Sequence, residues 1–330
     1  MSLRKFLRLF THIQLLPVLE NGEETTLIGG QAVMEGVMMR SPHSYCVAVR
    51  KPTGEIVTEE HPLPRLSDRY PIFKLPVIRG LGTLGHAMWL GMKALKFSAD
   101  CAFEELTGNK QGDGAKKEIG PLGIALQVVS SLLFMIVLYK FVPLLLATLI
   151  GRHFHAFSGR FAINLVDGTL RIAIFLGFMY LLSRLNEMHR VFEYHGAEHR
   201  VVFNFESGQP VNVENAQRFV TWHPRCGTSF LVVVLIISLI CYAFLPFDNF
   251  WAKLVARIAL LPLIAGLSYE IIRFAARRKS GILPILTRPG LWLQRVTTQP
   301  PSNAQTEVAI VALERAMELE KTLGGELVIA

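Results

Sequence analysis

The sequence predicts a membrane protein that is mainly α-helical, with about four transmembrane helices and a small cytosolic α+β portion near the N-terminus. Of the 330 residues, 51% are hydrophobic and only 18% are charged, and the mean hydropathy is +0.37. This balance is typical of chains that face lipid. Four apolar runs are each close to the ~20 residues that a helix needs to cross a bilayer. Ahead of them, residues 27–64 combine β-branched residues, glycines and turn signals, which favours strands.

The N-terminal segment, residues 1–26, predicts an amphipathic segment that lies on the inner leaflet of the membrane. Arg4, Lys5 and Arg8 interrupt the apolar residues around them, and no small-residue cleavage site follows. A signal peptide is therefore not favoured. A disordered basic tail is the alternative.

Residues 27–118 are expected to form a cytosolic or interfacial α+β portion. Two strand-like runs, YCVAVRK and EIVTEE, flank a turn signal at residues 52–54, which predicts a hairpin. Residues 76–105 are rich in helix formers but interrupted by glycine and charge, so they predict an interfacial or packed helix. The Gly- and Lys-rich stretch 107–118 is typical of a linker.

Residues 119–280 are predicted to hold the four-helix transmembrane domain. The expected spans are residues 122–149, 170–188, 229–246 and 252–275. Basic residues gather at 110–117, 184–225 and 273–288, whereas the connections 151–168 and 247–252 carry few. By the positive-inside rule, both termini and the hairpin 189–228 therefore lie in the cytoplasm.

The C-terminal region, residues 281–330, is expected to form a cytosolic helix. From Ser302 onward, apolar residues recur at helical intervals. Such an amphipathic helix should pack on the cytosolic domain or on a protein partner.

Charge and cysteine content narrow the class of protein further. The net charge of +8 fits basic flanks that face anionic membrane lipid, and the chain carries no nucleic-acid motif, so we expect no nucleic-acid partner. The four cysteines are scattered without a C-x-x-C pair. A disulfide framework is therefore not expected, and a reducing compartment is favoured.

The stretch EYHGAEHR, residues 193–200, predicts a metal site. If the second span continues as one helix from residue 169 to 200, His195 and His199 are i,i+4 neighbours on one face. Glu198 lies beside them and completes H-x-x-E-H, the inverted zincin pattern, in which two imidazoles bind zinc and the carboxylate acts on water.

A second pair of potential ligands, His223 and Cys226, precedes the third span. Both pairs lie at the same membrane face, because spans two and three are antiparallel neighbours joined by a cytosolic hairpin. Imidazole and thiolate suit a divalent metal, Zn²⁺ first and Fe²⁺ as the alternative. The competing interpretation places these histidines in the interfacial belt of aromatic and basic residues. Between the pairs we expect a turn at 207–210 and a helix start near Asn212.

Three further residues are candidates for the site. Glu270 lies inside the fourth span, where an ionisable group is costly unless it is paired or bound to a metal. Its alternative is a structural salt bridge with Arg273 or with another arginine. Glu35 and Arg40 lie in GGQAVMEGVMMR, which is not a P-loop. If this segment folds onto the site, Glu35 would serve as an extra ligand or base and Arg40 would bind an anion. A strand–turn with a structural Glu35–Arg40 pair is equally compatible.

Five stretches of the sequence resemble the YqhQ-like family of bacterial membrane proteins, domain of unknown function 1385. They are GGQAVMEGVMMRSP (29–42), YHGAEHRVVFNFESG (194–208), HPRCGTSFL (223–231), SYEIIRFA (268–275) and PGLWLQRVTT (289–298). The resemblance extends over about residues 27–320 and implies a protein of the bacterial inner membrane. It also implies a metal-dependent enzyme, although that label rests on the same His and Cys pattern and names no reaction.

The favoured hypothesis is a membrane-embedded, metal-dependent hydrolase that acts at the cytoplasmic membrane face. In it, His195 and His199 bind the metal with Cys226 or His223 as third ligand, and Glu198 moves protons. The substrate is a peptide, a lipid or a lipid-linked phosphate. Arginines near the motifs suit an anionic group of the substrate, namely Arg40, Arg200 and Arg225.

Two other classes of function compete with the hydrolase. The first is a non-enzymatic scaffold or regulator, in which three histidines and one cysteine form a closed structural zinc site and the cytosolic domain binds a protein partner. The second is a transporter. Few charges are expected inside the spans and the sequence has no inverted repeat, so a transporter is less favoured unless the chain forms a homo-oligomer.

Overall fold

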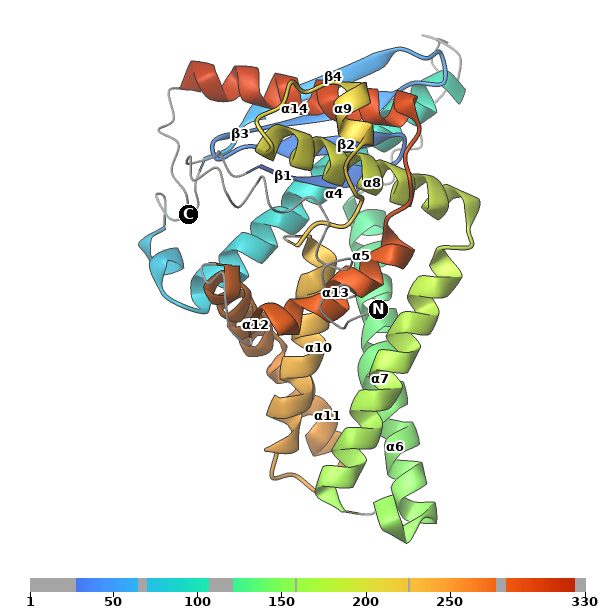
Figure 1. The fold of residues 1–330 in the computed structure, drawn as a ribbon. Helices are drawn as coiled ribbons and strands as arrows, with labels where there is room; N and C mark the ends of the chain where they lie inside the picture. Colours follow the sequence, from blue (N-terminus) through green and yellow to red (C-terminus); the bar gives the residue numbers. More distant parts are fainter. Residues whose placement is uncertain are drawn as a thin grey trace, which may run out of the picture.

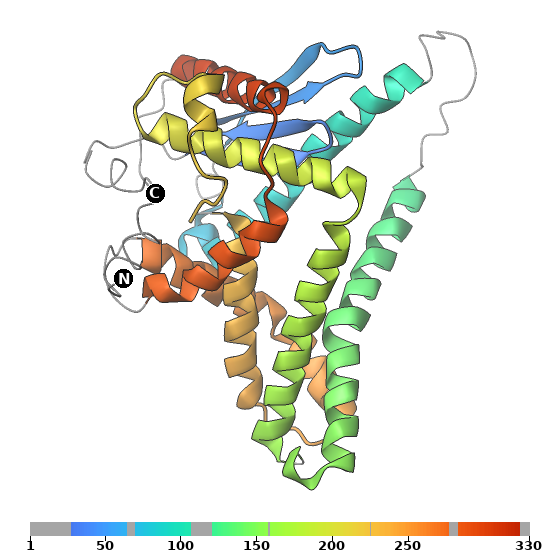
Figure 2. The same cartoon turned by 45° about the vertical axis from the view of Figure 1, so that its right-hand side comes forward.

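The computed structural model describes residues 28–64, 70–106, 121–157, 159–224, 226–276 and 283–323. Helices make up most of these residues, and a small antiparallel sheet lies near their N-terminal end. Figures 1 and 2 show the sheet and its covering helices at one end, with long helices projecting from it. The amphipathic segment predicted for 1–26 and the linker predicted for 107–118 lie outside the described residues.

The sheet is an antiparallel meander in the order β1-β2-β3-β4. Its strands are β1 Gly29–Val33, β2 Gly36–Arg40, β3 Ser44–Arg50 and β4 Ile56–Pro62. The predicted hairpin is confirmed as β3 and β4. Its turn places Gly54 at a φ of 92°, a left-handed conformation that glycine adopts without steric cost. The tighter turn between β1 and β2 places Glu35 at a φ of 52°.

Helices cover both faces of the sheet (Figure 1). The first face is covered by α4 (Ile78–Leu106), which follows the short 3₁₀ helix η1 (Pro71–Lys74), and the second by α8 (Asn186–Glu206) and α14 (Asn303–Leu323). Met38 packs in the core that includes Leu90 of α4. Met39 points to the opposite face, as the two-residue period of a strand requires, and packs in the core that includes Leu313 of α14. The α+β portion is therefore assembled from both ends of the chain and not from residues 27–118 alone.

Two of the described helices are long and apolar enough to cross a membrane, Leu126–His153 and Arg160–Leu182. A third span results if α11 (Phe250–Ala259) and α12 (Leu261–Ala276), bent by 46° at their junction, count as one. Helix α10 (Gly227–Ala243) is apolar but has only 17 residues, which is about 26 Å. That is short of the ~30 Å hydrocarbon core. Length and composition thus give two or three candidate spans where the sequence predicted four.

The first candidate span contains a π-helical turn. It runs through α5 (Pro121–Ile136), the π turn η2 (Val137–Phe141) and α6 (Val142–His153), and the 3₁₀ helix η3 (His155–Phe157) follows. Pro143 is the physical reason for the irregular turn, because it has no N–H to donate to the carbonyl four residues before it.

The helical bundle buries charges that the sequence analysis did not anticipate. Asp167 and Arg171 of α7 (Arg160–Leu182) form an ion pair, and Arg257 Nη1 lies 2.8 Å from Asp167 Oδ1. None of these three side chains is more than 3% exposed. Lys140 of η2 donates a hydrogen bond to the hydroxyl of Tyr242 at 3.0 Å. Pairing between helices offsets the cost of burying these charged groups.

The single helix expected from residue 169 to 200 is also wrong. Helix α7 ends at Leu182 and α8 begins at Asn186, with Leu185 between them in an extended conformation. Figure 2 shows α8 turning away from α7 across the end of the bundle. From Ser183 onward the sequence becomes polar, so a straight continuation of α7 would have no apolar face to turn toward lipid. As a separate amphipathic helix, α8 instead buries one face against the sheet.

The segment after α8 matches the prediction. Helix α8 ends before the expected turn, in which Gly208 has a φ of 70°. Helix α9 (Val213–Gln217) begins after Asn212, whose side chain accepts a hydrogen bond from the N–H of Asn215 at 2.8 Å. The region 281–330 holds two helices and not one, because α13 (Leu283–Thr297) precedes α14.

Candidate metal centre

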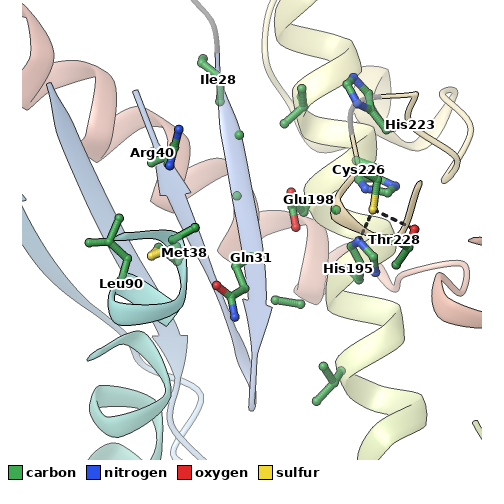
Figure 3. A pocket seen from close by; sticks show the side chains of 18 of the residues that line it. Ile28, Gln31, Met38, Arg40, Leu90, His195, Glu198, His223, Cys226 and Thr228 are labelled. Carbon is green, nitrogen blue, oxygen red and sulfur yellow. Dashed lines mark hydrogen bonds between the residues drawn. The ribbon is translucent and has the colours of Figure 1, made fainter. Parts of the chain in front are cut away.

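Three potential metal ligands converge where α8 meets the start of α10. His195 and His199 lie one turn apart on α8, and Cys226 is the N-cap residue of α10. One ligand atom from each residue lies within 4.8 Å of the other two. His195 Nε2 and Cys226 Sγ lie 3.2 Å apart (Figure 3). The structure thus brings together three of the four ligands that the sequence predicted, and we call these three the triad.

Backbone carbonyls fix both imidazoles of the triad. Nδ1 of His195 lies 2.8 Å from the carbonyl oxygen of Thr297, and Nδ1 of His199 contacts the carbonyl oxygen of Thr221. Because a carbonyl oxygen only accepts, Nδ1 carries the proton in both rings. Each Nε2 then keeps its lone pair for a metal, and this arrangement is typical of histidine ligands in metalloproteins.

Gly196 lets the carbonyl of Thr297 reach His195. The connection from α13 to α14 crosses α8 at this glycine, where the N–H of Gln299 donates to the carbonyl of Phe192 at 2.9 Å. A Cβ on Gly196 would lie 2.0 Å from the carbonyl oxygen of Gln299. The glycine inside the H-x-x-E-H motif is therefore required by the close approach of two backbones.

The start of α10 favours a thiolate at Cys226. An N-cap residue lies beside the unpaired N–H groups of the first helical turn, which favour negative charge. Burial raises the pKa of the Cys226 thiol, but its contacts with His199 and Thr228 lower it by more, so the pKa lies below the ordinary value. Burial also lowers the pKa of His199 to about 4. Neutral imidazole and thiolate are the forms that bind a metal.

Glu198 lies beside the triad and against the sheet. Its side chain is buried, and burial raises its pKa to about 7, although the charge of His195 and the N–H of Gly30 act in the opposite direction. A Cβ on Gly30 would lie 2.9 Å from Cδ of Glu198, so only glycine lets β1 approach this carboxyl group so closely. A carboxyl group that titrates near pH 7 next to a metal site is suited to proton transfer.

The triad and Glu198 line one cavity of about 630 Å³. Its walls come from β1, β2, α4, α8 and the start of α10, and Figure 3 shows side chains from these elements around β1. Most of the lining is apolar, and the polar groups are few. This size and lining are typical of sites for small ligands.

His223 lies next to the triad without joining it. Its ring centroid is 5.6 Å from that of His199, and its Nε2 lies 3.5 Å from Oε2 of Glu206. Gln294 of α13 fixes the backbone of His223 through two hydrogen bonds, one of 2.7 Å from the His223 N–H and one of 2.9 Å to its carbonyl. Burial lowers the pKa of His223 to about 4.

The structure places Glu35 and Glu270 outside the cavity lining. Glu35 accepts two hydrogen bonds of 2.5 Å from Arg190 and one of 3.3 Å from Tyr194, so the alternative Glu35–Arg40 pair does not form. Glu270 of α12 pairs with Arg79 of α4, with 2.7 Å between Nε and Oε1. Both carboxylates therefore tie elements together instead of joining the triad.

Of the two described arginines that were predicted to contact substrate, Arg40 lines the cavity and Arg200 does not. Arg200 points toward α9, where it donates to Oε1 of Gln217. Arg225 lies outside the described residues.

Several residues that shape the site escaped the sequence analysis. Thr221 and Thr297 act through backbone carbonyls, which leave no signal in the sequence. Gln294 is fully buried in an otherwise amphipathic helix, and that isolated amide could have marked it. Gly30 and Gly196 matter only because another chain segment lies against them.

Comparisons with known proteins place these features in a family. Residues 75–319 match the family described as protein of unknown function (DUF1385). The chain is 33% identical over 297 residues to the uncharacterized protein YqhQ of Bacillus subtilis (strain 168), and the alignment covers 88% of this chain and 92% of that relative. No solved structure matches the chain.

Proposed function

The chain belongs to the DUF1385 family of proteins of unknown function, and on that premise we propose that it is a membrane-embedded, metal-dependent hydrolase acting at the cytoplasmic membrane face. One observation carries the proposal. Backbone carbonyls fix Nδ1 of two imidazoles, so that each Nε2 is directed toward a cysteine whose thiol pKa is lowered. A buried carboxyl group lies next to these three side chains. This combination is costly to bury without a ligand.

The donor set fits zinc, with iron as the alternative. Zinc bonds of about 2.1 Å to nitrogen and 2.3 Å to sulfur put tetrahedral ligand atoms about 3.5 Å apart. The 3.2 Å between His195 Nε2 and Cys226 Sγ is close to that value. Three protein ligands leave one position of a tetrahedral ion for a small molecule, which is typical of catalytic zinc sites. Such an ion supplies a Lewis acid that polarises an ester, amide or phosphoryl oxygen.

Glu198 is the proposed general base and acid. Burial raises the pKa of its carboxyl group above the ordinary value, which brings proton uptake and release closer to neutral pH. It can therefore accept a proton from water and return it to a leaving group. The N–H of Gly30 and the close packing of β1 hold its carboxyl group in place.

In this proposal the chain crosses the cell membrane four times with both termini in the cytoplasm. Leu126–His153 and α7 form the first two spans, α10 the third, and the bent pair of α11 and α12 the fourth. The triad then lies at the cytoplasmic end of α10, where membrane lipid or a lipid-linked substrate reaches the cavity. Membrane lipid is the expected partner, and a protein partner or a second copy of the chain is the alternative.

A non-enzymatic scaffold with a structural zinc site is the second candidate. Its supporting observation is His223, whose ring lies next to His199 and could supply a fourth ligand. A closed site of four ligands stabilises a fold and does no chemistry.

The test of the hydrolase is a comparison of Glu198→Gln with Glu187→Gln, an exposed glutamate at the start of α8. Zinc-loaded proteins in neutral detergent are assayed against ester, amide and phosphoester substrates. Glu198→Gln should keep its metal and lose about 10²-fold or more in rate, while Glu187→Gln keeps the wild-type rate. Equal rates in both variants, or no hydrolysis by zinc-loaded wild type across the panel, would favour the scaffold.

A further inference from the structure

Arg40 is a half-buried cation that lines the cavity. It is the last residue of β2, and its side chain forms no hydrogen bond or ion pair with any residue that the structure describes. Tyr269 of α12 and His86 of α4 are close enough to interact with its charge. A guanidinium carries five N–H donors and stays charged. Burial withdraws part of this charge from water and lowers the pKa of Arg40, and an acceptor group in the cavity would offset that cost.

Open space lies directly beside Arg40. Gly29 of β1 is its cross-strand partner, so the two side-chain positions are neighbours on one face of the sheet. A Cβ on Gly29 would meet no atom of the described residues within 4 Å. At Gly30, by contrast, a Cβ would lie 2.6 Å from the carbonyl oxygen of Met38. The two consecutive glycines thus differ: Gly30 permits close packing, and Gly29 leaves room for a group next to the guanidinium.

The cavity joins Arg40 to the triad through apolar walls. Figure 3 shows Arg40, Met38 and Leu90 on one side of β1, and His195, Cys226 and Glu198 on the other. The wall residues include Ile28, Met38 and Leu90. A molecule complementary to this cavity therefore has an anionic group at Arg40, an apolar part along the walls and its hydrolysable bond near the triad.

We propose that Arg40 and the space at Gly29 form the anion subsite of the substrate, and that the substrate is an amphiphile whose phosphate is attached to an apolar chain. The planar fork of arginine matches two phosphate oxygens at once. The phosphate belongs to a membrane lipid head group or to a soluble alkyl phosphate, which share this chemistry. The assignment of this anion as part of the substrate rests on the proposed hydrolase. Binding of the anion itself does not require the metal.

The test is calorimetric titration of the detergent-purified full chain with hexyl phosphate, with hexanol and inorganic phosphate as probes of its two halves. Wild type should bind hexyl phosphate more tightly than either half. Arg40→Gln should weaken the binding at least about 10-fold, as expected for loss of a charge-assisted pair, and Gly29→Leu should weaken it similarly by filling the space. Arg40→Lys, which keeps the charge without the fork, should fall between. Arg218→Gln, an exposed arginine paired with Glu214, is the control and should bind as wild type does.

Equal affinity in wild type, Arg40→Gln and Gly29→Leu would overturn the subsite. Dihexanoyl phosphatidic acid distinguishes a membrane lipid from a soluble alkyl phosphate as the source of the phosphate. Tighter binding than that of hexyl phosphate indicates a lipid, and weaker binding indicates a soluble molecule. The titration is repeated with Cys226→Ser, which lacks one triad ligand. Binding retained in Cys226→Ser supports the anion subsite even if the chain holds no metal, whereas a metal-loaded wild type that binds no hexyl phosphate refutes the subsite alone.

Discussion

At the scale of single residues, the site depends on side chains that the motif names and on backbone atoms that it does not. His195 and His199 are equivalent in the motif, yet their Nδ1 atoms contact carbonyls from two different connections, at Thr297 and Thr221. Each contact selects the tautomer that leaves Nε2 available. The metal affinity should therefore depend on residues that never touch the metal.

Gly196→Ala tests this dependence. The new methyl group would overlap the carbonyl oxygen of Gln299, 2.0 Å away, and displace the connection that carries Thr297. Loss of such an outer contact typically costs 10–100-fold in metal affinity, so we expect a loss of about that size in a zinc titration against a competing chelator. Gly177→Ala, on α7 with no neighbouring atom within 4 Å, is the matched control. Unchanged affinity in Gly196→Ala would show that the carbonyl of Thr297 has no influence on the ligand.

The residues that sequence reasoning located share a local signal. His195, Glu198 and His199 lie within one helical turn, so their spacing alone brings them together. Glu35 and Glu270 carry the same chemistry, but their arginine partners lie 155 and 191 positions away in the sequence. No spacing rule reveals such pairs, and a structural role could not be separated from a catalytic one before the fold was known.

At the scale of elements, α14 is fixed on the sheet by one buried carboxylate. Glu320 accepts hydrogen bonds of 2.6 Å from the Ser41 hydroxyl and 2.9 Å from the N–H of His43, and its Oε1 lies 2.7 Å from Nδ1 of His43. The side chain is only 5% exposed. Burial opposes ionisation, but these hydrogen bonds outweigh it and lower the pKa of Glu320 below its ordinary value.

Glu320→Gln should destabilise the protein by about 1–3 kcal/mol at pH 7, because the hydrogen bonds lose their charge. A carboxyl group with a lowered pKa in the folded state stabilises the protein above its ordinary pKa of 4.5 and loses that contribution as pH falls through the folded-state pKa. The difference between wild type and variant, measured by chemical unfolding, should therefore shrink as the pH falls below 4.5. Glu318→Gln, exposed on the same helix, is the control. A difference that does not change with pH would contradict the ionised form of Glu320.

Elements were predictable from sequence where the signal was local. The β3–β4 hairpin follows from its turn residues, α14 from its apolar spacing, and the start of α9 from Asn212. The break between α7 and α8 was not predictable, because both segments have helical periodicity and only the tertiary contacts of α8 decide where the axis changes. The same holds for α11 and α12, which form one apolar run in sequence but are bent by 46°.

At the scale of the whole molecule, distant parts of the chain meet at the cavity. The sheet comes from residues before the spans, α8 and the start of α10 from the middle, and the carbonyl of Thr297 from the connection to α14. Inside the bundle, Asp167 joins Arg171 of its own helix to Arg257 of α11. Because every part contributes to the site or to its support, we expect the chain to fold as one unit in the membrane.

The proposed topology predicts where reporters become active. A phosphatase reporter that needs export should be inactive when fused after residue 330 and active when fused after Gly159, at the connection between α6 and α7. A cytoplasmic fluorescent reporter should give the opposite pattern. Phosphatase activity at the C-terminal fusion would place the triad outside the cell and overturn the cytoplasmic assignment.

The most direct test of the central claim is the metal content of the chain, purified in detergent without chelators. We expect about one zinc or iron per chain in the wild type, a loss of most of it in His195→Ala and in Cys226→Ser, and full retention in His223→Ala, since His223 lies beside the triad without joining it. Loss of metal in His223→Ala would indicate a closed four-ligand site and favour the scaffold. Absence of metal from the wild type, or its retention in both triad variants, would contradict the metal centre itself.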